Sequence, residues 1–195
     1  MSLHADALAV LRGWPAPNAA QEALRREYVA HLEARPDAFE RSCVPQHLTA
    51  SVLVLDPDRT RILLTLHAKS GRWFQFGGHT EAHDRTLADA ALRETVEESG
   101  LAVDQLDLHP TPVLLDAHHV PFCGPDGVRH LDVMFRAEAH ADARPSVSEE
   151  SLDVAWWPLD ALPNPELAAF VGLAVAQSTP SGGGSTWAAA DHPSR

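Results

Sequence analysis

The sequence contains little cysteine and no long hydrophobic run. Cys43 and Cys123 are the two cysteines among 195 residues, too few for a disulfide framework, so we expect a cytoplasmic location. No stretch of about 18 or more apolar residues occurs, which excludes a membrane-spanning helix of the usual kind. The N-terminus lacks the basic segment and apolar stretch of a signal peptide, so none is expected.

The chain also lacks a net positive charge. Its formal net charge of −12 at pH 7 would repel a phosphate backbone, so no nucleic-acid polymer is expected as a partner. A small phosphorylated ligand is compatible with this charge, because a bound cation reverses the local field. The GxxxxGK[ST] phosphate loop and the GxSxG nucleophile elbow are both missing, which argues against two large enzyme classes.

Length and periodicity predict one folded domain preceded by an N-terminal helical extension. Apolar residues make up 45% of the chain, enough for a sizeable core. An apolar patch lies within residues 1–17, and residues 19–35 carry helical periodicity between a capping Asn18 and Pro36. We therefore expect a helical extension over residues 1–40, the main folded domain over residues 41–177 and a disordered, glycine-rich tail over residues 178–195.

The middle of the chain alternates between strand-like and helical patterns. Strands are predicted at 48–55, 61–67, 73–76, 111–120, 130–139 and 154–157, with a turn at 56–60. Helices are predicted at 86–100, 158–162 and 165–176. This order predicts an α+β domain with helices covering both sides of a mixed sheet.

The stretch from Gly77 to Leu101 carries the clearest chemistry. Thr86 is a suitable helix cap and Gly100 a suitable helix end. The helix between them presents three carboxylates at spacing i, i+3, i+4, and therefore on one face; they belong to Glu94, Glu97 and Glu98. The other side carries an apolar stripe suited to packing on a sheet, formed by Ala88, Leu92 and Val96.

Three neighbouring carboxylates repel one another, and Arg93 is the one cation close to them in sequence. One arginine cannot neutralise three glutamates. A hard divalent cation, Mg²⁺ or Mn²⁺, would relieve the repulsion. The alternative is a solvated acidic face without a ligand.

These residues resemble the Nudix box, the signature of hydrolases that cleave nucleoside diphosphates linked to another moiety. The match runs from Gly78 to Leu101 and includes Arg93-Glu94, Glu97-Glu98 and Gly100. Three departures occur: Asp84 stands where the family has glutamate, one extra residue separates it from Arg93, and Thr95 replaces an aliphatic residue.

The resemblance implies a Nudix-like α/β/α sandwich and a metal-dependent hydrolase that cleaves a phosphoanhydride bond. It implies Glu94, Glu97, Glu98 and the Gly78 carbonyl as ligands of Mg²⁺ or Mn²⁺, with Arg93 orienting a glutamate. Many members of the family carry an acidic residue near the position of Glu149 and Glu150, where it serves as a further ligand or general base.

A second cluster of reactive residues surrounds a predicted hairpin. His118, His119, Cys123 and His130 lie near one another in sequence, but their spacing matches no standard zinc pattern. Contact with a phosphorylated substrate is a better use for the three histidines and for Glu150. The alternative is that these histidines are structural.

Two rival functions remain open. A non-catalytic nucleotide-binding or regulatory module could keep the fold without turnover. Some prenyl-diphosphate isomerases share this fold, and they resemble a pattern in which the catalytic cysteine stands in an Asn-x-Cys-like context. Neither Cys43 nor Cys123 has that context. The helical extension over residues 1–40 could also form a homodimer contact.

Overall fold

The structure is a computed structural model, and it describes residues 1–124, 126–148 and 151–176. Glu149, Glu150 and the predicted tail at 178–195 lie outside the described residues. The helices are α1 (Leu3–Gly13), α2 (Ala19–Ala34), α3 (Leu87–Ser99) and α4 (Pro165–Ala176), with a short 3₁₀ turn η1 (Val103–Gln105). The strands are β1 (Gln46–Leu55), β2 (Arg61–His67), β3 (Trp73–Phe74), β4 (Phe76–Gly78), β5 (Leu106–Val120), β6 (Val128–Ala139) and β7 (Ser151–Pro158).

Strand β1 is the centre of a mixed sheet. It runs parallel to β6 over its whole length, from the pair Gln46–Arg129 to the pair Leu55–Glu138. Its other edge pairs antiparallel with β2 and β4, and β5 pairs antiparallel with β6. Nine of the ten β1 residues are buried, as expected for a strand covered on both faces.

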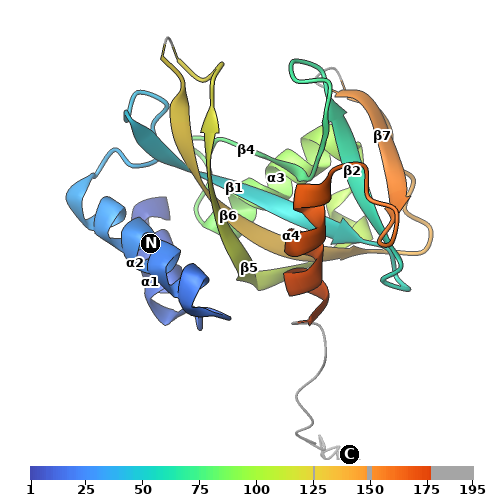
Figure 1. Cartoon of the computed structure of the whole chain (residues 1–195), viewed down its shortest axis with the longest axis horizontal. Helices are drawn as coiled ribbons and strands as arrows, with labels where there is room; N and C mark the ends of the chain where they lie inside the picture. The colour runs from blue at the N-terminus through green and yellow to red at the C-terminus, as the bar shows by residue number, and fades with distance from the viewer. Residues whose placement is uncertain (125, 149–150, 177–195) are drawn as a thin grey trace, which may run out of the picture.

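Helices cover both faces of this sheet (Figure 1), which confirms the α/β/α sandwich. The larger core lies on the side of α1, α2 and α3, where alternate residues of β1 and β6 such as Val52 and Val133 are buried. The smaller core lies under α4 and includes Leu53, Met134 and Val171. Every helix of the described ranges is too short or too polar to cross a membrane.

The two N-terminal helices are attached to the sheet by polar side chains as well as apolar ones. The Trp14 indole donates to the Pro112 carbonyl at 2.6 Å. The Gln21 amide pairs with both backbone groups of Leu115, at 2.7 and 2.9 Å. The Tyr28 hydroxyl donates to the carbonyl of Asp116 at 2.8 Å. These bonds satisfy backbone groups at β5, the terminal strand of the sheet path.

Most predicted elements are found, three strands (β1, β6 and β7) begin two or three residues earlier than predicted, and four further details differ. The helix predicted at 158–162 is wrong: β7 continues to Pro158 by pairing with Arg61, and a turn follows, because Pro163 disfavours helical backbone at the residue before it. Strand β5 begins at Leu106, five residues early, through its pairing with the end of β6. The strand predicted at 73–76 is two short strands interrupted at Gln75.

The fourth difference concerns the buried face of α3. The predicted stripe of Ala88, Leu92 and Val96 packs against the larger core but is only partly buried. The fully buried face is offset and less apolar, and it consists of Leu87, Ala90, Ala91, Thr95, Glu98 and Ser99. The reason is that α3 contacts β1, β4 and α1, and its Glu98 accepts a hydrogen bond from the Gly77 amide of β4.

Candidate functional site

Local capping sets the length of α3. The Thr86 hydroxyl accepts from the Asp89 amide at 2.9 Å at the start of the helix. Gly100 ends it in the left-handed conformation, with φ of 67°. Thr95, the departure from the expected aliphatic, is fully buried, and its hydroxyl donates to the Ala91 carbonyl at 2.7 Å. The box helix therefore forms as its sequence predicts, and Thr95 is accommodated within it.

Arg93 is the centre of the site. Its guanidinium donates to both carboxylate oxygens of Asp84 at 3.1 and 3.2 Å, and to the His79 carbonyl at 2.9 Å. It also donates to Glu94 at 3.0 Å and to Glu97 at 2.9 Å. This planar group thus ties the loop before the helix to the carboxylates on the helix.

The carboxylates of α3 lie against the two glycines of β4. The Gly77 amide donates to Glu98 at 3.2 Å. A β-carbon added at Gly78 would lie 2.8 Å from Oε2 of Glu94. Glu98 is 7% exposed, whereas the Glu97 side chain is 57% exposed. The glycines therefore allow two glutamates to approach the strand backbone closely.

Charge pairing within the site shifts two pKa values. Burial by itself would raise the pKa of Asp84, but the hydrogen bonds from Arg93 and from the Glu81 amide, together with the charge of Arg93, outweigh it and leave that pKa below its ordinary value. Burial by itself would lower the pKa of Arg93, but the hydrogen bonds to Asp84 and the charge of Glu94 raise it. Both groups are therefore charged at pH 7. Although Asp84 replaces the glutamate of the family pattern, it still provides a carboxylate partner for Arg93.

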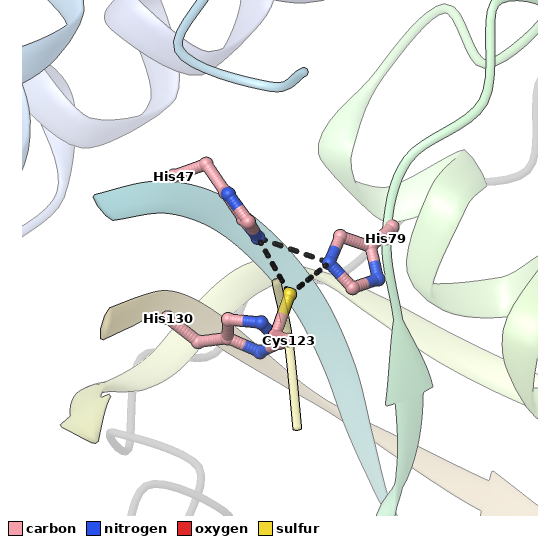
Figure 2. A group of neighbouring side chains, drawn as sticks. All are labelled: His47, His79, Cys123 and His130. Carbon is pink, nitrogen blue, oxygen red and sulfur yellow. Dashed lines mark hydrogen bonds between the residues drawn. The ribbon is translucent and has the colours of Figure 1, made fainter. Parts of the chain in front are cut away.

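The predicted histidines gather only in part, because the rings of His118 and His130 lie 5.7 Å apart across β5 and β6, whereas His119 lies on the other face of the strand. His118 and His119 are exposed, and His118 contacts Asp116 at 2.8 Å. This contact raises the pKa of His118. His130 also joins His47, His79 and Cys123 (Figure 2). Burial lowers the pKa of His130 to about 3, so its ring is neutral at pH 7. Sequence reasoning missed His47 and His79, which lie far from the hairpin along the chain.

A buried carboxylate lies next to this histidine cluster and was also missed. Asp132 lies two residues after His130 on the same face of β6 and is 4% exposed. It accepts hydrogen bonds from the hydroxyls of Thr49 and Ser51 on β1. Burial raises its pKa. An acidic residue in the middle of an apolar strand pattern was the available signal.

Comparison with known proteins identifies the family. A NUDIX domain profile matches residues 45–176. The oxidized purine nucleoside triphosphate hydrolase of Mus musculus is 34% identical over 119 residues, covering 60% of this chain and 69% of that protein.

Solved structures agree on the fold. The dihydroneopterin triphosphate pyrophosphohydrolase of E. coli superposes with a TM-score of 0.55 at 17% identity, over 67% of this chain and 96% of that one. The Ap4A hydrolase of C. elegans gives a TM-score of 0.54 at 18% identity over the same shares. The chain therefore belongs to the Nudix family of hydrolases and is a pyrophosphohydrolase of nucleotide-type substrates.

Proposed function

We propose that this hydrolase cleaves a phosphoanhydride bond in a nucleoside-diphosphate-linked or related compound, with Mg²⁺ or Mn²⁺ as its cofactor. The observation that supports it best is the placement of Glu94 and Glu98 against Gly78 and Gly77. Two carboxylates brought to one short strand segment form an oxygen-rich site against the backbone of β4.

The donor set fits a hard divalent cation. Glu94, Glu97 and Glu98 would hold it, together with the Gly78 carbonyl, and all are oxygen donors of the kind that Mg²⁺ and Mn²⁺ prefer. Such a cation supplies positive charge that polarises phosphoryl oxygens and favours deprotonation of water. Glu97 is the most exposed of the three carboxylates and is therefore the most accessible from solvent.

The chain's own residues then have separate tasks. Arg93 positions Glu94 through the 3.0 Å hydrogen bond and holds the loop through Asp84. The Gly77 amide orients Glu98. One of the three carboxylates, or an acidic residue at 149–150, accepts the proton of the attacking water. We keep His118 and His119 as proposed substrate contacts, whereas His130 lies within the cluster of His47, His79 and Cys123 and is not kept as one.

Replacement of the carboxylates tests this proposal. Glu97→Gln and Glu98→Gln should each lower kcat by about 100-fold or more while the circular dichroism spectrum stays unchanged, because the charge but not the shape is lost. Glu33→Gln is the matched control, since Glu33 is an exposed helical glutamate that pairs only with Arg12 in the described contacts. Removal of divalent metal by a chelator should abolish turnover, and Mg²⁺ should restore it.

The substrate is found by a panel assay. The mouse relative is named for oxidized purine nucleoside triphosphates, so these belong in the panel beside dinucleotides, ADP-ribose and nucleoside diphosphate sugars. Release of a phosphorylated product identifies the bond cleaved. Tight binding of a panel member in Mg²⁺, seen by calorimetry without any product, would instead favour the non-catalytic nucleotide-binding alternative.

A further inference from the structure

Four side chains from separate segments converge near the start of the box loop. His47 lies on β1, His79 directly follows β4, Cys123 lies in the β5–β6 connection and His130 lies on β6 (Figure 2). One ligand atom from each lies within 4.8 Å of every other. The Nε2 atoms of His47 and His79 are 2.9 Å apart, and the Cys123 sulfur is 3.8 and 3.7 Å from them.

The sheet register explains why the histidines meet. Parallel pairing places His47 directly beside His130, and both side chains leave the same face of the sheet. The three imidazole rings of His47, His79 and His130 are mutually 4.9 Å apart between centroids. Cys123, in the β5–β6 connection, places its thiol among these rings, next to His47 and His79 (Figure 2).

Hydrogen bonding leaves ring nitrogens available at the centre. His47 Nδ1 lies 3.3 Å from the Cys43 carbonyl, so this nitrogen carries the proton and Nε2 keeps its lone pair. His130 Nε2 is a buried nitrogen without a hydrogen-bond partner in the described part of the chain. A buried polar nitrogen without a partner costs free energy of folding, unless a hydrogen bond or a metal ion satisfies it.

The spacing suits a tetrahedral ion. Ligand bonds of about 2.0–2.1 Å to nitrogen and about 2.3 Å to sulfur imply nitrogen–nitrogen separations of about 3.3 Å and nitrogen–sulfur separations of about 3.6 Å. The separations among His47, His79 and Cys123, at 2.9, 3.7 and 3.8 Å, require only small side-chain shifts to match. The His130 nitrogen lies within 4.8 Å of the other ligand atoms, so it would move inward by at most about 1.5 Å. Imidazole and thiolate select zinc-like metals over Mg²⁺.

We propose that His47, His79, Cys123 and His130 form a structural Zn²⁺ site, separate in its ligands from the carboxylates of α3. On binding, the Cys123 thiol loses its proton to solvent and the three imidazoles bind as neutral ligands. Four protein ligands close the coordination sphere, which distinguishes a structural site from a catalytic one. The site joins β1, β6 and the hairpin to His79, whose carbonyl accepts from Arg93 at 2.9 Å.

Co²⁺ is the spectroscopic probe for this site. The full chain, reduced and stripped of metal, is titrated with Co²⁺ in excess Mg²⁺, which occupies oxygen-ligand sites. Wild type should bind one equivalent with a near-ultraviolet band of thiolate-to-cobalt charge transfer. Cys123→Ser should abolish the band, whereas the matched control Cys43→Ser should keep it. His130→Ala should weaken binding by more than about 100-fold, beyond the loss from removing an outer-shell group.

A second measurement uses only the wild-type chain. Alkylation of Cys123, followed by mass spectrometry, should slow by at least about tenfold when one equivalent of Zn²⁺ is added. Absence of the band, its loss in Cys43→Ser, or alkylation of Cys123 at an unchanged rate would overturn the zinc site. Glu98→Gln should keep the cobalt band, so a failure of the proposed hydrolysis mechanism and a failure of the zinc site give different results.

Discussion

Arg93 contacts groups from both halves of the box. Its side chain is 13% exposed and bonds one loop carboxylate, one loop carbonyl and two helix carboxylates. The sequence predicts that Arg93 orients a glutamate, and the contact with Glu94 is consistent with that role. Asp84 was not predicted as a partner of Arg93, because the distance between the two side chains depends on how the loop folds.

Asp84→Asn should reveal this pairing as a pH-dependent loss of stability. The pKa of Asp84 in the folded protein lies below its ordinary value of 3.8. The charged carboxylate therefore stabilises the fold, and this contribution is fully present at pH values well above 3.8. The contribution is lost as the pH falls through the lowered folded pKa. Urea unfolding at pH 7 should show a loss of about 2 kcal/mol, and the difference from wild type should shrink at pH 3. Asp58→Asn, in an exposed turn, is the control, and an equal loss at both pH values would contradict the charge argument.

Strand β4 contains two glycines, and a different neighbouring group leaves no room for a side chain at each of them. Gly77 has φ of 154°, and a β-carbon there would lie 2.6 Å from the Ala50 carbonyl on β1. At Gly78 the obstacle is the end of the Glu94 side chain. The sequence predicted close backbone approach at this junction, but only the folded structure separates the two contacts.

The two alanine variants should therefore fail in different ways. Gly77→Ala should destabilise the protein by about 1–3 kcal/mol, because backbone on β1 must move. Gly78→Ala should stay within about 1 kcal/mol of wild type, since a flexible side chain can yield. It should still lower kcat by up to about 100-fold by displacing Glu94. Thermal melting and steady-state kinetics measure the two effects, and a fully active Gly78→Ala would remove Glu94 from the mechanism.

At the scale of the whole molecule, the N-terminal helices bond to β5, the terminal strand of the sheet path. Gln21 of α2 pairs with the amide and carbonyl of Leu115 as a neighbouring strand would. Asp6 of α1 accepts from the Leu87 amide at 3.0 Å, in the first turn of the box helix. The extension is thus bonded both to β5 and to the element that carries the carboxylates.

Gln21→Ala tests how much the extension contributes to stability. It removes two hydrogen bonds and leaves the backbone groups of buried Leu115 without these partners, so the free energy of unfolding should fall by about 1–3 kcal/mol. Urea denaturation measures the change. Glu33→Ala, at an exposed position of the same helix, should change stability by less than about 1 kcal/mol. Equal effects of the two variants would show that the Gln21 contacts contribute little.

Local patterns in the sequence were enough to predict the box helix, with Thr86 at its start and Gly100 at its end, and most strands, since capping and alternation act over a few residues. The Gly78–Leu101 motif was enough to indicate the family. The family match then confirmed that indication.

Only the tertiary structure decided which distant groups meet. His47 lies beside His130 because β1 and β6 pair in parallel with one register, and no local pattern encodes that register. Of the hairpin histidines, His118 pairs with His130 across β5 and β6, whereas the adjacent His119 lies on the other face, since neighbouring residues on a strand point to opposite faces. Spacing along the chain therefore predicted the carboxylates on one helix, whereas the histidine and cysteine cluster depends on how four segments pack.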